Sequence, residues 1–207
     1  MNSETVVALG LFSIATSITP GPNNIMLLAS GVNFGFRRTL PHTLGISVGF
    51  CILLLSVGLG LGTLFTTVPG LHLALKVLGS LYMLYLAFQI ASSRKLSNKL
   101  SRKPTQANPQ KAHKPMTFLA AALFQWVNPK AWVMAVSSMA LYTNATRPYL
   151  SVLMVAAIFS SLNWPSCSTW AICGQALKRF LSDSTRLKWF NIAMGTLLAA
   201  SVVLIIK

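Results

Sequence analysis

The sequence predicts an all-α integral membrane protein with six transmembrane helices, arranged as two inverted three-helix repeats in which helices 1 and 4 are broken. Three observations support this fold class. Hydrophobic residues make up 54% of the 207 residues and charged residues only 9%, whereas soluble proteins contain roughly 25% charged residues. The apolar residues form six long segments. Two of these segments are interrupted, at corresponding places, by a polar motif that contains proline.

Six segments are long enough to span a bilayer, which takes about 20 mostly apolar residues. They fall at about 5–33, 41–66, 70–92, 115–143, 148–177 and 187–206. We therefore expect a single transmembrane domain over residues 1–207. It consists of a first three-helix half (1–93), a basic cytoplasmic linker (94–114) and a second three-helix half (115–207).

The distribution of charge predicts the orientation. The chain carries 17 Lys and Arg residues but only two acids, Glu4 and Asp183. Thirteen of the basic residues lie in the first, third and fifth connections, and basic loops stay on the cytoplasmic side of a membrane. Both termini are then expected outside the cytoplasm, in the periplasm for a bacterial inner membrane. Because the basic residues lie between apolar runs, we expect the lipid bilayer as a partner and no nucleic acid.

The two interruptions are TPGPNN (19–24) in the first segment and NPK (128–130) in the fourth. Asn23 and Asn128 are 105 residues apart, which is close to half the chain. Three spans in each half is an odd number, so equivalent halves would lie in opposite orientations across the bilayer. Inverted repeats of this kind are common in transporters.

Each interruption is expected to start a second half-helix. Proline lacks an N–H but suits the first position of a helix, after a residue whose side chain caps the free N–H groups. We expect Thr19 or Asn23 to be that cap in the first segment and Asn128 in the fourth. The N-terminus of a half-helix carries a partial positive charge, which suits a carboxylate.

Lys130 lies inside the fourth segment, where a lysine marks a functional site by default. The alternative is a lysine paired with backbone carbonyls near a helix end. Asn163 and Pro165 interrupt the fifth segment, and together they either add a third polar wall to the cavity or form a packing kink. The predicted substrate-binding residues are Thr19, Pro20, Gly21, Pro22, Asn23, Asn24, Asn128, Pro129, Lys130 and Asn163.

The stretches SITPGPNNIMLLASGVNFGFRRTL and NPKAW resemble the LysE/RhtB family of amino-acid efflux proteins, especially its cysteine/O-acetylserine exporter branch, and the likeness covers essentially the whole chain. The resemblance implies secondary active export of small neutral amino acids or derivatives, either cysteine- and O-acetylserine-like or threonine- and homoserine-like. It also implies alternating access and proton coupling. Related exporters can lack the second proline, so Pro129 is expected to matter less than Asn128 and Lys130. The matching residues are Pro20, Gly21, Pro22, Asn23, Asn128, Pro129 and Lys130.

The alternative function is a transmembrane thiol/disulfide electron carrier or another non-transport membrane protein. Such a carrier needs a cysteine beside each break, but Cys51, Cys167 and Cys173 all lie more than 25 residues from either motif. The apolar segments contain no Asp or Glu, so no acid–base pair or metal cluster can be assembled. We therefore expect a transporter rather than an enzyme, with no catalytic residue, metal or cofactor. The oligomeric state is left open, a homodimer included.

Three residues near the start of the second segment have other expected roles. Gly45 and Gly49 are four residues apart and favour close helix packing. His42 is expected to be a solvated histidine at the membrane interface, and a role in proton transfer is the alternative.

Overall fold

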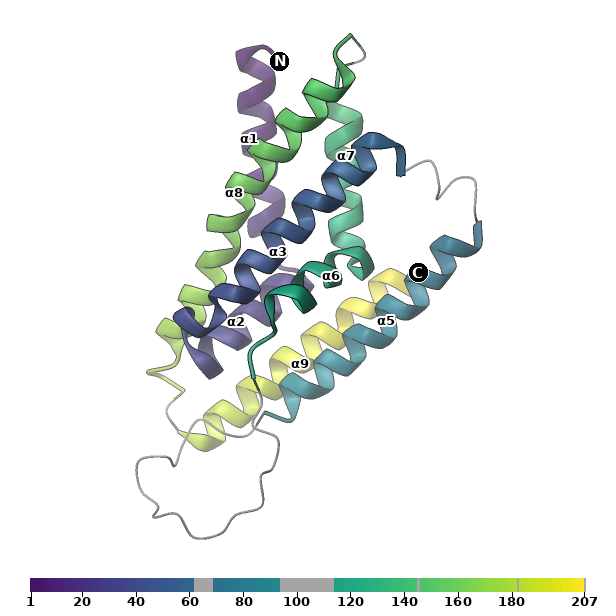
Figure 1. Ribbon diagram of the computed structural model, residues 1–207. Coiled ribbons are helices and arrows are strands. Elements are labelled where there is room, and N and C mark those ends of the chain that lie inside the picture. The colour runs from purple at the N-terminus through teal and green to yellow at the C-terminus, as the bar shows by residue number, and fades with distance from the viewer. Residues whose placement is uncertain (62–68, 94–113, 145, 182, 207) are drawn as a thin grey trace.

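The computed structural model describes residues 1–61, 69–93, 114–144, 146–181 and 183–206, and within these ranges the chain forms helices and turns but no strand. The predicted linker 94–114 lies outside the described residues except for Lys114. The helices are α1 (Ser3–Ile18), α2 (Pro22–Phe34), α3 (Phe36–Ser56), the π-helical η1 (Val57–Leu61), α5 (Pro69–Ala91), α6 (Phe118–Val127), α7 (Pro129–Tyr142), α8 (Pro148–Leu177) and α9 (Ser184–Ile206) (Figure 1).

Each predicted segment corresponds to one helix or to a pair of consecutive helical stretches, which confirms the all-helical class. The largest difference is at the second segment, which begins at Phe36 rather than at residue 41. Gly35 adopts a φ of 82° between α2 and α3, a value that glycine reaches without strain. Pro41 then falls in the second turn of α3, where it removes only one backbone hydrogen bond.

Only some of the six predicted spans correspond to described helices that are long and apolar enough to cross a membrane by themselves. Among the described residues, Phe36–Leu61 and Pro148–Leu177 are each long and apolar enough to cross a membrane. Helices α1 and α2 add a third span if they are taken as one broken unit, bent by 58°. The six-span topology with inverted repeats therefore stays a prediction.

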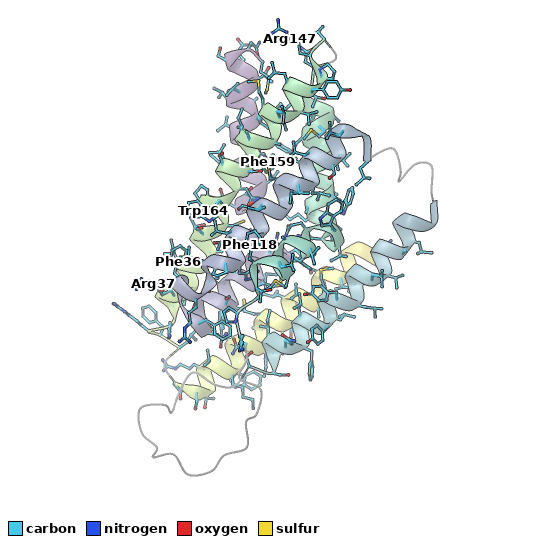
Figure 2. All side chains as sticks on the ribbon, viewed as in Figure 1. Phe36, Arg37, Phe118, Arg147, Phe159 and Trp164 are labelled. Carbon is cyan, nitrogen blue, oxygen red and sulfur yellow. The ribbon has the colours of Figure 1, made fainter. Side chains whose placement is uncertain are left out.

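The two ends of the molecule differ in charge. Figure 2 shows Arg37 at one end and Arg147 at the other, and the N-terminus lies at the Arg147 end (Figure 1). Helices α5 and α8 end, and α9 begins, at the Arg37 end, which we call the basic end. Its described basic residues are Arg37, Arg38, Lys114, Lys178, Arg179, Arg186 and Lys188.

Helices α3 and α8 pack against each other in the middle of the molecule, and α5 pairs with α9 beside them (Figure 1). Helix α3 also packs closely on α6. A Cβ added to Gly45 would lie 2.3 Å from the Phe118 carbonyl oxygen, and one added to Gly49 would lie 2.5 Å from Ala122 Cα. Only glycine allows this approach, so the packing role predicted for Gly45 and Gly49 is confirmed.

The interruption predicted in the fifth segment is wrong. Helix α8 continues from Pro148 to Leu177 with Pro165 inside it. A proline within a helix removes one backbone hydrogen bond. Phe159 and Cys167, on either side of Pro165, are both buried against other helices, and this packing holds α8 together across the proline.

Candidate functional site: a central cavity at the two helix breaks

Both breaks place a proline at the first position of the second half-helix. Helix α2 begins at Pro22 and α7 begins at Pro129. These two prolines correspond, and the residue before each is the N-cap: Gly21 in the first span and Asn128 in the fourth. The structural counterpart of Asn128 is therefore Gly21, rather than Asn23 as the spacing of the asparagines suggested.

The predicted cap is confirmed in the fourth span and wrong in the first. The Asn128 side chain accepts a hydrogen bond from the Lys130 backbone N–H at 3.2 Å. No side chain caps α2, because the two candidates are used elsewhere. Thr19 Oγ1 donates back to the Thr16 carbonyl at 2.8 Å, and Asn23 turns toward α6. The N-terminus of α2 thus keeps its N–H donors beside the cavity described below.

The carbonyl groups at the end of α1 do have partners. Asn24 Nδ2 donates to the carbonyls of Ser17 and Thr19, both at 2.8 Å. Trp170 Nε1 on α8 donates to the Ile18 carbonyl at 3.1 Å. Carbonyls at a helix end need such partners where water is excluded. The side chain of Asn24 and the indole of Trp170 therefore stabilise the break.

An equivalent contact stabilises the second break. Trp132 Nε1 donates to the Trp126 carbonyl, near the end of α6, at 2.8 Å. The two indole rings also lie edge to face, with centroids 6.2 Å apart. Each break therefore has a tryptophan N–H that satisfies a carbonyl of the half-helix before it.

Two side-chain contacts link the breaks to each other. Lys130 Nζ donates to the Thr19 carbonyl at 2.6 Å and to Thr19 Oγ1 at 2.9 Å. Asn23 and Gln125 exchange amide hydrogen bonds at 2.8 and 3.3 Å. The second residue of each later half-helix thus contacts the end of the earlier half-helix of the other span. For Lys130, the predicted alternative of pairing with a backbone carbonyl is therefore observed.

The backbone at Gly21 makes room for the lysine. A Cβ at this position would lie 2.8 Å from Lys130 Cδ and 3.2 Å from its Nζ. A larger residue here would displace the aliphatic chain of Lys130. The glycine of the TPGPNN motif therefore lets the end of the Lys130 side chain pass close to the backbone on its way to Thr19.

A small cavity, which we call the central cavity, lies where the two breaks meet. Its volume is about 20 Å³, which is room for about one water molecule, so the cavity is closed to a larger ligand in this conformation. Four of the predicted residues do not line the cavity: Thr19, Pro20, Pro22 and Pro129. Thr19 is hydrogen-bonded to Lys130, which does line it, and the three prolines belong to the breaks. The predicted residues that line it are Gly21, Asn23, Asn24, Asn128, Lys130 and Asn163.

The cavity combines a cation with unpaired hydrogen-bond acceptors. Ser17 Oγ and Asn24 Oδ1 are buried and have no hydrogen-bond partner within the described residues, although both residues line the cavity. Leaving such a group unpaired costs about 1–3 kcal/mol. Lys130 supplies positive charge next to them. A molecule with both a carboxylate and an ammonium group would satisfy these atoms.

Sequence reasoning missed several lining residues. Gln125 was identifiable as the one amide side chain in the apolar stretch PMTFLAAALFQWV, three positions before Asn128. Cys167 is distant from both motifs in the sequence, yet α8 brings it to the cavity, where its Sγ donates to Asn163 Oδ1 at 2.8 Å. The other missed residues are Thr16, Ser17, Phe50, Ala131 and Met134.

His42 also differs from expectation. It is only 2% exposed, and neither ring nitrogen has a hydrogen-bond partner in the described part of the chain. The expected solvated interface histidine is therefore wrong. The residue lies on α3, which packs against α2, α6 and α8, and it lines a cavity together with residues of α2 and α5.

Broken helices with a polar cavity at the breaks are an architecture of membrane transporters. The chain belongs to the LysE type translocator family, whose model matches residues 14–206. It is therefore a membrane transporter rather than an enzyme, in a family of bacterial inner-membrane efflux proteins.

Several relatives match nearly the full length of the chain. It is 29% identical over 205 residues to a "Cysteine/O-acetylserine efflux protein" of Klebsiella pneumoniae, with 98% of this chain and 99% of that protein covered. It is 29% identical over 200 residues to the protein of the same name in Escherichia coli K12, covering 96% of this chain and 95% of the relative. The Shigella flexneri protein of that name is 30% identical over 193 residues, 92% of each chain. No solved structure matches the chain significantly.

Proposed function

We propose that the protein exports small neutral amino acids or their derivatives, of the cysteine and O-acetylserine kind, from the cytoplasm across the inner membrane. The family and the names of the relatives support this class of substrate. The observation that carries the proposal is the composition of the central cavity: the Lys130 cation lies together with two unpaired acceptors, Ser17 Oγ and Asn24 Oδ1.

The substrate carboxylate is bound by Lys130 and by the N-terminus of α2. An ammonium group has three N–H donors, and Lys130 uses two of them on Thr19. The uncapped N-terminus of α2 adds backbone donors and a partial positive charge. The ammonium group of the substrate donates to Asn24 Oδ1 and Ser17 Oγ. The side chain of the substrate then faces the apolar part of the lining, formed by Phe50, Ala131 and Met134.

Transport proceeds by alternating access between two inverted three-span halves. The corresponding prolines and the reciprocal links between the breaks support this symmetry. The basic end faces the cytoplasm and both termini face the periplasm, in keeping with the positive-inside rule. Because both breaks belong to one chain, one copy holds a whole site, and a homodimer would hold two. The proton gradient drives export, as the family resemblance implies.

Loss of the Lys130 cation tests the proposal. Cells that express the protein are loaded with radiolabelled cysteine, serine, threonine or homoserine, and efflux is measured at matched levels of membrane-inserted protein. Lys130→Ala is expected to lower efflux about tenfold or more, since a hydrogen bond to a charged group contributes about 1.5–3 kcal/mol. The control is Lys188→Ala, an exposed lysine at the basic end, with unchanged efflux. Unchanged efflux by Lys130→Ala overturns the site, and absence of efflux of every amino acid by the wild type overturns the function.

The thiol carrier finds little support in the structure. All three cysteines are free, and only Cys167 lines the central cavity. Cys51 packs against the hydrophobic core, and Cys173 is exposed. A thiol relay through the breaks needs a second cysteine at the cavity, and the chain places none there.

A further inference from the structure

A second and larger cavity lies toward the basic end of the molecule. Its volume is about 310 Å³, compared with about 20 Å³ for the central cavity. Ligand sites for small molecules begin at about 300 Å³. Its walls are the later half of α2, the start of α3, the end of α5 and the segment 114–120. We call this cavity the vestibule.

A buried histidine without partners lines the vestibule. His42 is 2% exposed, and neither Nδ1 nor Nε2 has a hydrogen-bond partner among the described residues. Its polar neighbours are already engaged: Ser30 Oγ bonds to Thr39 Oγ1 at 2.8 Å, and Asn33 Nδ2 donates to Asn191 Oδ1 at 2.8 Å. A neutral imidazole offers one N–H donor and one acceptor, and both are unused here.

The charge of the vestibule favours a ligand with a carboxylate. Among the described residues that line it, Lys114 is the one Lys or Arg, and there is neither Asp nor Glu. Tyr82 and Tyr85 line the cavity from α5, and Tyr85 OH accepts from Gln89 Nε2. One cation, two phenols and an unpaired imidazole can bind both the carboxylate and the ammonium group of a zwitterion.

The vestibule and the central cavity both lie along α2, and polar and apolar side chains separate them. Asn23 lines the central cavity, and Met26, one turn later on α2, lines the vestibule. The Asn23–Gln125 amide pair joins α2 to α6 at this level. Beside it, Met26 and Phe124 belong to one buried apolar cluster, and Phe124 contacts Tyr82 with ring centroids 5.8 Å apart.

We propose that the vestibule is a second binding site for the exported amino acid, occupied from the basic end before the central cavity opens. This inference rests on the proposed function. The ring nitrogens of His42, which are covered in this conformation, bind the zwitterion once the side chain turns toward the vestibule, and Lys114 attracts the carboxylate. The amino acid then passes to Lys130 and Asn24 when the Asn23–Gln125 pair separates.

The experiment measures transport into inside-out membrane vesicles, in which the cytoplasmic face is outside, with radiolabelled L-cysteine kept reduced as the probe. His42→Phe keeps the ring volume but removes both hydrogen-bonding atoms, and is expected to raise KM about tenfold with kcat nearly unchanged. His42→Gln restores a donor and an acceptor and is expected to recover most of the affinity. Lys130→Ala, by contrast, lowers kcat, because it acts at the central cavity.

A second pair of variants tests the vestibule without changing the buried histidine, whose substitution could disturb folding. Ala120 is half-buried and lines the vestibule, so Ala120→Phe fills part of the space and is expected to raise KM as His42→Phe does. The adjacent Leu119 is 64% exposed and does not line the vestibule, so Leu119→Phe is the matched control with wild-type kinetics.

Equilibrium binding of the same probe to purified protein completes the test. Lys130→Ala is expected to retain binding, and the variant that combines Lys130→Ala with His42→Phe is expected to lose it. Wild-type KM in both His42→Phe and Ala120→Phe overturns the vestibule site and leaves the proposed function intact. A wild-type protein that neither binds nor transports any amino acid overturns both.

Discussion

Asn23 and Lys130 occupy the same position in two half-helices, since each directly follows the proline that begins its helix. Each side chain reaches the other broken span: Asn23 Nδ2 donates to Gln125 Oε1 at 2.8 Å, and Lys130 Nζ donates to the Thr19 carbonyl at 2.6 Å. The geometry of each break therefore depends on the other. This mutual dependence is the basis of the first two predictions.

Gly21→Ala is expected to lower amino-acid efflux about tenfold at normal levels of membrane-inserted protein. The new Cβ would lie 2.8 Å from Lys130 Cδ and would move the ammonium group away from Thr19, with loss of charged hydrogen bonds. Gly10→Ala is the control, because a Cβ there makes an ordinary contact of 3.6 Å with Leu162 Cδ1. Equal efflux from the two variants would contradict the role of Gly21.

The Asn23–Gln125 pair is expected to show energetic coupling in a double-mutant cycle. Either single substitution, Asn23→Leu or Gln125→Leu, removes the hydrogen-bond partner of the remaining amide. Each is expected to lower the free energy of unfolding by about 1–2 kcal/mol. The double variant is expected to lose about 1 kcal/mol less than the sum. The measurement is equilibrium unfolding in mild detergent, and strict additivity of the two changes would show that the pair contributes nothing.

Asn128→Ala is expected to destabilise the start of α7 by about 1 kcal/mol, the usual effect of losing an N-cap side chain. Asn128→Ser keeps an oxygen that can accept from the Lys130 backbone N–H and should retain most of the stability. Thermal unfolding of both variants in detergent checks this. If the serine variant unfolds at the temperature of the alanine variant, the contribution of Asn128 lies outside its capping bond.

The chain that combines Cys51→Ala, Cys167→Ser and Cys173→Ala is expected to export at the wild-type rate. Cys167→Ser keeps a donor for Asn163 Oδ1, which the thiol contacts at 2.8 Å, and the other two cysteines lie outside the central cavity. Efflux of a substrate without sulfur, such as serine or homoserine, gives the cleanest measurement. Loss of efflux in this variant, with normal insertion, would restore the thiol carrier as a candidate.

The start of α7 was predictable because its signal is local: Asn128 caps the helix and Pro129 suits its first position. The start of α2 was not, since the expected caps Thr19 and Asn23 lie on either side of the observed N-cap Gly21. The cap of α2 was not predictable, because Thr19 and Asn23 have competing partners. Thr19 contacts Lys130, 111 residues away, and Asn23 contacts Gln125, 102 residues away.

The surroundings of Cys167 and His42 depend on helix packing, and neither has a local sequence signal. Cys167 reaches the central cavity because α8 packs on α1 and α2. His42 is buried because α3 packs among other helices, and residues of α2 and α5 lie in the same lining. The periodicity of an apolar segment in a membrane does not distinguish a face that meets lipid from a face that meets another helix, because both are apolar.

The placement of the chain's two acids limits which substrates the protein can carry. Glu4 lies in the first turn of α1 and Asp183 directly precedes α9, at opposite ends of the molecule (Figure 1). Neither acidic side chain is therefore available to Lys130 as a counterion, and in the proposed function the substrate carboxylate would take that role. A substrate with a cationic side chain carries a net positive charge, which a zwitterion does not, into the same low-dielectric space as Lys130. Lysine and arginine should consequently compete poorly with neutral amino acids, whatever the size of their side chains.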